Sequence, residues 1–409
     1  MHSEVTNPDG GRGPWARVVS APQVGALAAA SVVARLPFGM GGISLVIFVH
    51  ARTGSFGVAG LVTGIYTLAF ALAGPLLGRQ IDRRGPRTVL VSASIVSALG
   101  LVAVAVVGEG SAATLPLVLA AAVAGASVPP VSGVLRRTWP ALIPRADLTT
   151  AYLFDSVLIE IVFLCGPLLT GILAAAVDPV APLFVAAAFV LFGTAWFLLV
   201  PVVRAERPSG APRGSAMGAL AAPAIRYITL AGLPIGASFG ALDVALPAFG
   251  SAHGSSALGG IFAASLSVGS MLGAVAFGLL AARLGMLREA SLRLAAYQPL
   301  VIAPLLLATG PVVLIPLAVL AGSFAAPMLT LRSRVAELTM PDGTGTETFT
   351  WLLLAVMVGA SASSALAGPL IEAGGWRAGI VQAVAVPLIA LPLLFAGRRL
   401  LPEAGLQHG

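Results

Sequence analysis

The feature that most constrains this chain is a succession of apolar runs, each about 20 residues long, that recurs along almost its whole length. A helical run of this length crosses a hydrocarbon core of roughly 30 Å. The 409 residues are 58% hydrophobic and only 10% charged, with a mean hydropathy of +0.98. Soluble domains carry far more charge, because their surface residues must be solvated. The sequence therefore predicts an all-α integral membrane protein with many spans.

Twelve spans can be placed, in two sets of six. They are expected at 24–49, 57–77, 88–108, 114–135, 150–176 and 181–203, and then at 224–249, 257–281, 291–309, 311–331, 348–371 and 377–396. Only Gly310 and Pro311 separate the ninth span from the tenth. The predicted organisation is a tail (1–22), a six-helix bundle (23–203), a Pro-, Gly- and Arg-rich linker (204–222), a second bundle (223–398) and a short tail (399–409).

The arginines indicate the orientation, since the chain contains no lysine. If the N-terminus is cytoplasmic, every arginine except Arg35, Arg52 and Arg377 falls on the cytoplasmic side, as the positive-inside rule requires. We therefore expect both termini in the cytoplasm and the protein in a bacterial inner membrane. The net charge of +7 does not indicate a nucleic-acid partner, because the arginines are spread over short loops and form no continuous patch.

The two halves repeat. Four short matches recur in order at nearly constant offset: LPFG at 36–39 with LPIG at 233–236, GRQIDRRGPR at 78–87 with GLLAARLGML at 278–287, PVSGVLRR at 130–137 with PMLTLRSR at 327–334, and CGPL at 165–168 with AGPL at 367–370. This order indicates duplication of a six-helix unit. Two such halves around a midplane site are typical of secondary transporters. The sequence shows neither a P-loop nor an HExxH or Ser/Lys pair within spans, so no enzyme is expected.

The segment GRQIDRRGPR resembles the loop between the second and third helices of the major facilitator superfamily, whose pattern is approximately G-x-x-x-D-R-x-G-x-R. The matching residues are Gly78, Asp82, Arg83, Gly85 and Arg87, with a weaker copy at Gly278, Arg283 and Gly285. The resemblance implies the superfamily fold of twelve helices in two pseudo-symmetric six-helix bundles. It also implies a cytoplasmic gate in which Asp82 lies near Thr346–Thr350 when the inner side is closed. The alternative is that these arginines only set the topology.

A second segment, GPLLTG at 166–171, resembles the motif of the family's antiporters through Gly166, Pro167 and Gly171. Val162 and Thr170 stand where the family has further glycines. The alternative is a packing kink without bearing on transport direction. A further departure is that no arginine lies in the fourth span, where proton-coupled exporters of the family often carry one.

Arg35 lies near the centre of the first span, a placement that costs roughly 2.5–3.5 kcal/mol unless the charge meets water or a partner. Our hypothesis is an ion pair between Arg35 and Glu160 of the fifth span, lining a central cavity, with Glu160 as the protonatable group. The alternatives are that the pair is a static strut, or that the two residues do not meet.

Two other acidic residues complete the predicted proton and substrate pathway. Asp155 is nearer the cytoplasmic end of the fifth span and is expected to meet Arg136 or Arg137. Asp243 lies in the seventh span, across the cavity from the first half.

The predicted function is secondary active export of a small, largely apolar molecule by proton antiport through alternating access. The expected partners are this substrate, protons and the lipid bilayer. No cofactor, metal, catalytic residue, nucleic acid or obligate protein partner is expected, and the single Cys165 excludes an intrachain disulfide. The alternatives are uptake or uniport by the same fold, or a transport-inactive sensor or assembly partner.

Overall fold

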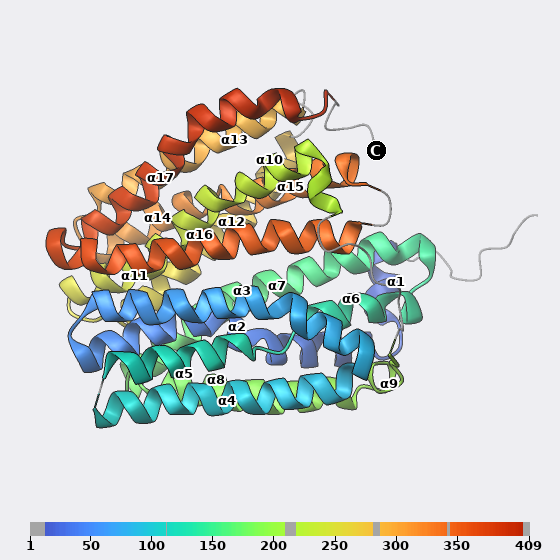
Figure 1. Cartoon of the computed structure of the whole chain (residues 1–409), viewed down its shortest axis with the longest axis horizontal. Coiled ribbons are helices and arrows are strands. Elements are labelled where there is room, and N and C mark those ends of the chain that lie inside the picture. Colours follow the sequence, from blue (N-terminus) through green and yellow to red (C-terminus); the bar gives the residue numbers. More distant parts are fainter. Residues whose placement is uncertain (1–12, 112, 209–217, 281–286, 342–343, 404–409) are drawn as a thin grey trace, which may run out of the picture.

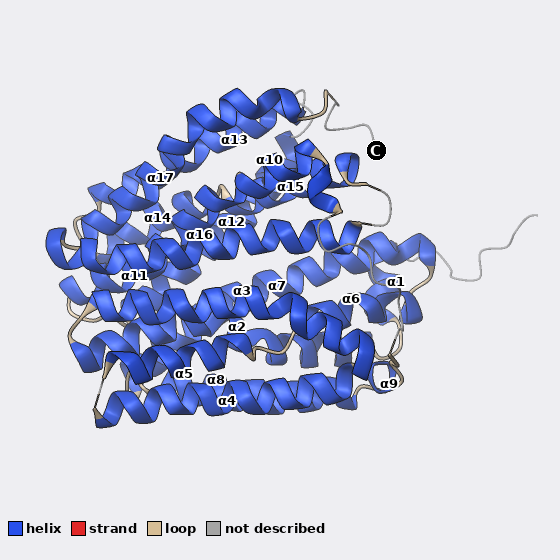
Figure 2. Ribbon diagram, viewed as in Figure 1, coloured by secondary structure: helices blue, strands red, loops and turns tan. Residues whose placement is uncertain are grey.

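A computed structural model describes residues 13–403, apart from 112, 209–217, 281–286 and 342–343. The described residues form helices and connecting loops without any strand (Figure 2). Twelve helical segments among them are long and apolar enough to cross a membrane. The prediction of an all-α protein with twelve spans is confirmed.

The first bundle begins with a short helix, α1, ahead of its first span. Its elements are α1 (Pro14–Ser20), α2 (Val24–Thr53), α3 (Phe56–Arg84), α4 (Pro86–Gly110), α5 (Thr114–Ala126), α6 (Val131–Leu142), η1 (Arg145–Asp147), α7 (Leu148–Ala176), α8 (Ala181–Leu199) and α9 (Pro201–Arg204). The six spans are α2, α3, α4, the pair α5–α6, α7 and α8.

The second bundle repeats this order. Its elements are η2 (Ala219–Ala221), α10 (Pro223–Leu230), α11 (Gly232–Ala252), α12 (Leu258–Leu280), α13 (Leu287–Ile302), η4 (Ala303–Leu307), α14 (Pro311–Gly322), α15 (Ala325–Thr339), α16 (Gly345–Gly374), α17 (Trp376–Gly397) and η5 (Arg398–Leu400). The spans are α10–α11, α12, α13–η4, α14–α15, α16 and α17.

Equivalent spans of the two bundles are interrupted at equivalent places. Pro129 and Pro130 separate α5 from α6, because proline lacks the N–H donor that a continuous helix needs. Ser323 and Phe324 separate α14 from α15 in the corresponding span of the second bundle. Interrupted helices in corresponding positions are a feature of transporter folds, in which they line the central site.

Helix packing shows the duplication directly. Within the first bundle α2 packs against α7 and α8, and within the second bundle α11 packs against α16 and α17. Between the bundles α3 packs against α16, and α12 packs against α7. The second span of each bundle therefore lies on the fifth span of the other, and the two bundles occupy the two halves of Figure 1. The predicted repeat is confirmed as a two-fold arrangement of helices.

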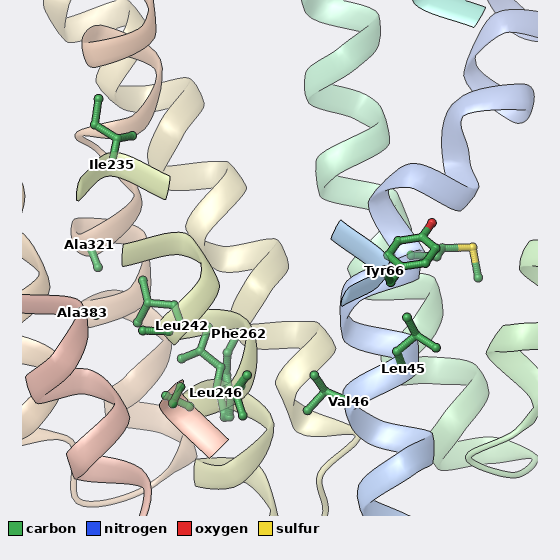
Figure 3. Packing of buried hydrophobic residues seen from close by; sticks show 14 of the residues in the cluster. Leu45, Val46, Tyr66, Ile235, Leu242, Leu246, Phe262, Ala321 and Ala383 are labelled. Atoms are coloured by element: carbon green, nitrogen blue, oxygen red, sulfur yellow. The ribbon is translucent and has the colours of Figure 1, made fainter. Parts of the chain in front are cut away.

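Buried apolar side chains form a core that continues from one bundle into the other. The largest cluster includes Leu45 and Tyr66 of the first bundle together with Leu242 and Phe262 of the second (Figure 3). The apolar core therefore extends across the contact between the two bundles.

Two small-residue crossings set how closely the bundles approach. A Cβ at Gly60 of α3 would overlap the backbone of α16 at Ser364, and a Cβ at Gly260 of α12 would lie 2.6 Å from the backbone nitrogen of Gly171 on α7. By contrast, Gly74 and Gly78 on α3 have open space around them. We call the side that carries α1, α9 and η5 the tail side, and the opposite side, with the turns at Gly54–Ser55 and Gly375, the distal side. The close glycine crossings lie toward the distal side.

Candidate transport site between the two bundles

Arg35 forms a buried ion pair inside the first bundle. Its Nη1 donates to Oδ1 of Asp155 on α7 at 2.8 Å, and its Nε and Nη2 donate to the carbonyl and hydroxyl of Ser31 at 3.1 and 3.0 Å. The Arg35 and Asp155 side chains are only 4% and 2% exposed. Buried charges are tolerated when they are paired and hydrogen-bonded, and these contacts explain how α2 carries an arginine.

The expected pair between Arg35 and Glu160 is therefore wrong. Successive residues of an α-helix are rotated by about 100°, so Asp155 and Glu160 point in directions about 140° apart on α7. Because Asp155 faces α2, Glu160 faces elsewhere. The expectation that Asp155 meets Arg136 is confirmed, since Arg136 Nε lies 3.4 Å from Asp155 Oδ2. Asp155 is thus shared between two arginines of its own bundle.

Glu160 lies where α7 meets the second bundle. Its half-buried carboxylate lies near the hydroxyl of Ser270 on α12. One turn further along the same helices, Ser267 Oγ donates to the carbonyl of Phe163 at 2.8 Å. None of the ion pairs between described residues includes Glu160. This carboxylate therefore lies between the bundles beside a hydroxyl, and it has no cationic partner among the described residues.

Asp243 projects from α11 toward the first bundle. Its Oδ2 would lie 3.7 Å from a Cβ added at Gly42 of α2, so the glycine leaves room for the carboxylate. Thr63 of α3 borders the same position, and its buried hydroxyl has no hydrogen-bond partner in the described part of the chain. Asp243 likewise takes part in no ion pair with a described residue. The structure thus brings Glu160 and Asp243 to the junction of the bundles.

Residues 78–84 form the end of α3, and the tight turn of this segment lies at Gly85. Gly85 ends α3 at φ +81°, a conformation that favours glycine, and Pro86 begins α4 at once. Asp82 accepts a hydrogen bond from Arg137 Nη1 at 2.8 Å, and Arg137 Nη2 lies 3.4 Å from Glu206 beyond α9. Arg83 and Arg87 are exposed. The contact of Asp82 with Thr346–Thr350 in an inner-closed state stays a prediction.

In the weaker copy of this loop, Gly278 lies on α12 with open space around it. Arg283 and Gly285 fall outside the described residues.

The glycines of the GPLLTG segment lie at two helix crossings. A Cβ at Gly166 would lie 2.9 Å from the Cα of Gly39 on α2, and a Cβ at Gly171 would lie 2.7 Å from the carbonyl oxygen of Ala257 in the second bundle. Pro167 lies inside α7, which continues without interruption to Ala176. These residues therefore let α7 approach a neighbour in each bundle.

Two polar features were not foreseen from the sequence. Arg332, expected in a cytoplasmic segment, lies instead on α15 and is 6% exposed. Its Nε and Nη2 donate to the carbonyls of Ile228 and Leu352 at 3.1 and 3.2 Å. The expectation failed because α15 continues to Thr339; the helical spacing of Met328, Leu331 and Val335, which are buried on the same helix, was the available signal.

The other feature is a link between the bundles at their distal ends. Glu372 near the end of α16 accepts hydrogen bonds from the Ser55 hydroxyl at 2.5 Å and from the backbone nitrogen of Gly57 at 2.9 Å. Ser55 also caps α3 by accepting from the nitrogen of Val58. The serine before an apolar run is a recognisable cap, but its partner 317 residues away is not visible in the sequence.

A model of the major facilitator superfamily matches residues 27–303, which is more than half of the chain. The chain belongs to the major facilitator superfamily. No curated protein matches the sequence.

Solved structures of this superfamily's architecture agree with the fold. A single-residue mutant of the nucleoside transporter NupG has a TM-score of 0.75 at 14% identity, over 91% of this chain and 98% of that one. A bacterial homologue of the iron transporter ferroportin in an inward-facing state gives 0.69 at 17% identity, over 91% and 98%. An auto-inhibited peptide transporter of the POT family gives 0.70 at 14% identity, over 92% and 96%. Identities this low support the fold and not a shared substrate.

Membership of the major facilitator superfamily gives the junction residues their context. The chain is a multi-pass membrane transporter with a small-molecule substrate. In such a fold the substrate site lies near the midplane where the two bundles meet. Glu160 and Asp243 lie at this junction, whereas Arg35 and Asp155 lie within one bundle.

Proposed function

We propose that this protein exports a small, largely apolar molecule from the cytoplasm in exchange for protons, by alternating access. The observation that carries the proposal is the position of Glu160, a carboxylate of α7 that lies beside α12 without a cationic partner among the described residues. An ionisable side chain within a span is costly and marks an ion or substrate pathway.

The position of Glu160 suits proton exchange because its surroundings change when the bundles rock. An ionised carboxylate needs water or a donor, whereas the protonated form is far less costly to enclose. Opening the junction on one side admits water to Glu160, and closing it removes that water. Proton binding and the conformational change therefore favour each other. Asp243, on the other bundle, is a second carboxylate whose hydration changes in the same way when the junction opens and closes.

The neighbours of Glu160 support a largely apolar substrate. Phe163 lies three residues further along α7, so the two side chains share a face of the helix. The Phe163 ring lies 5.4 Å from the ring of Phe38 on α2, which in turn lies 5.1 Å from Phe70 on α3. A row of three aromatic rings that begins one helical turn from Glu160 offers an apolar contact surface near a single ionisable group.

The export direction and location rest on the orientation of the chain. The excess of arginine on the tail side supports cytoplasmic termini, in a bacterial inner membrane. The distal ends of the bundles are joined by Glu372, Ser55 and Gly57, so the described contacts support a state that opens toward the tail side. An exporter takes up its substrate in this state.

The test uses inside-out vesicles that have been acidified internally and contain a pH-sensitive dye. Wild type, Glu160→Gln and Asp243→Asn are challenged with a panel of apolar compounds. The control is Glu289→Gln, which removes an equal charge from an exposed pair with Arg293 on α13. We expect at least one compound to release protons through wild type and the control, but not through Glu160→Gln.

The other outcomes are also decisive. Compound flux without a proton signal in wild type would replace antiport by uniport. Proton release by Glu160→Gln at the wild-type rate would remove Glu160 from the proton route. An absence of any flux would leave the fold intact and reject export.

A further inference from the structure

A groove of about 580 Å³ lies between α16 and α17 on the distal half of the second bundle. The residues that matter here are Leu370 of α16 and Arg377, Val381, Gln382, Ala385 and Val386 of α17. Leu370 and Val381 are 45% and 50% exposed although both are apolar. Because both helices are membrane spans, such exposed apolar side chains face lipid.

Arg377 supplies a positive charge at the distal end of the groove. It is exposed at the start of α17, and its guanidinium lies 4.4 Å from the ring of Trp376. Among the described residues no carboxylate pairs with it. The contrast is Arg52 on the same side, which pairs with Glu109 and Asp178 at 2.5 and 2.9 Å. Arg377 is thus oriented by an aromatic ring but lacks an anion.

Gln382 adds an unused acceptor deeper in the groove. Its Nε2 donates to the carbonyl and hydroxyl oxygens of Ser363 at 2.9 and 2.8 Å, which fixes the amide. Its Oε1 is buried and has no partner within the described part of the chain, and the residue is 8% exposed. Burying an amide oxygen without a hydrogen-bond donor costs free energy. A molecule bound in the groove could supply the missing donor.

We propose that this groove binds an anionic glycerophospholipid from the leaflet on the distal side. The phosphate lies on Arg377, whose planar guanidinium suits phosphate oxygens. One acyl chain follows the apolar wall of Val381, Ala385 and Val386. A small shift of the Gln382 side chain on lipid binding brings its oxygen to a hydroxyl of the lipid or to water carried with the headgroup. This site is separate from the transport site and does not depend on the transported substrate.

The test is native mass spectrometry of the purified full chain in detergent, with equal amounts of phosphatidylglycerol and phosphatidylcholine of identical acyl chains. One arginine near a membrane surface contributes enough to favour the anionic lipid about fivefold. We expect this preference in wild type and in Arg377→Lys, which keeps the charge, and its loss in Arg377→Ala. Arg52→Ala, which removes an arginine already paired on the same side, should keep the preference. Thermal unfolding of each variant confirms that it is folded.

Three results would overturn the proposal. The first is equal binding of the two lipids by wild type. The second is an unchanged preference in Arg377→Ala, or an equal loss in Arg52→Ala. The third is a lipid-free dimer that Arg377→Ala dissociates, which would make the groove a contact between two copies of the chain.

Discussion

At the scale of single residues, the buried pair of Arg35 and Asp155 fastens α2 to α7 within one bundle. Since both side chains belong to the same rigid unit, rocking of the bundles does not separate them. Removing one partner leaves the other charge buried and uncompensated, which is more costly than removing both. The size of this loss distinguishes a structural ion pair from a carboxylate that binds and releases protons during transport.

We predict that Arg35→Ala or Asp155→Asn lowers the free energy of unfolding by about 3–5 kcal/mol, because each leaves an unpaired charge in the bundle. Arg35→Met combined with Asp155→Leu should recover most of this loss. The measurement is thermal unfolding of the purified protein in detergent, with Glu289→Gln as the control. If the loss in this double variant equals the sum of the losses in Arg35→Met and Asp155→Leu measured separately, the pair is not coupled.

A second residue-scale prediction concerns Asp147, which precedes the fifth span. Arg17 of α1 donates to both carboxylate oxygens, with Nη2 at 2.6 Å from Oδ1 and Nε at 2.9 Å from Oδ2. These hydrogen bonds, together with the charge of Arg17, hold the pKa of Asp147 below its ordinary value of 3.8. A depressed pKa means that the stabilising contribution is complete above the ordinary value and is lost as pH falls through the folded-state value.

The stability difference between wild type and Asp147→Asn should therefore be constant above about pH 5 and shrink as the solution is acidified below about pH 4. Thermal unfolding across this range measures it. A difference that grows on acidification would contradict the assigned direction.

At the scale of helices, the two crossings between the bundles are equivalent. Gly60 of α3 packs on α16 at Ser364 and Gly368, and Gly260 of α12 packs on α7 at Pro167 and Gly171. In both cases the absence of a side chain lets two backbones touch. In the proposed transport cycle these contacts keep the distal side closed, so they favour the distal-closed state.

We predict that Gly60→Val opens the distal side, because its side chain overlaps the backbone of α16 and over-packing costs about 1–3 kcal/mol. The control is Gly74→Val on the same helix, where there is open space. In a Cys165→Ala background, a cysteine introduced at Ala174 reports opening of the distal side, because Ala174 is buried in the distal junction. A membrane-impermeant maleimide should label it faster in Gly60→Val and at the wild-type rate in Gly74→Val. Equal labelling in all three proteins would contradict the role of the crossing.

The spans and the duplication could be predicted because lipid demands long apolar helices, and because each half keeps its short motifs at a fixed offset. The partner of Arg35 could not be predicted, since choosing between Asp155 and Glu160 requires the rotation of α7 about its axis. A one-residue difference in that rotation moves a side chain by about 100°. Arg332 was assigned to a loop for a related reason. The sequence near the end of a span does not distinguish a charged residue in a loop from one in a buried last helical turn.

At the scale of the whole molecule, the proposed alternating access requires two sets of contacts between the bundles. One set closes the distal side and the other closes the tail side, in turn. On the distal side α3 and α16 are joined by the glycine crossing and by Glu372, which bonds Ser55 and Gly57 at the start of α3. On the tail side the described pairs of Asp82 and Glu206 with Arg137 lie within the first bundle and its linker. The distal contacts therefore define one end of the proposed transport cycle.

We predict that Glu372→Gln raises the population of the distal-open state about fivefold, because hydrogen bonds to a charged acceptor are roughly twice as strong as those to a neutral one. Spin labels at Ala113 and Ser256, in a Cys165→Ala background, report the distance between the distal loops of the two bundles. The control is Glu109→Gln, which removes a distal carboxylate whose partner Arg52 belongs to its own bundle. The long-distance population should grow in Glu372→Gln and stay at the wild-type level in Glu109→Gln. If both variants shift it equally, the effect arises from surface charge and not from the link between α16 and α3.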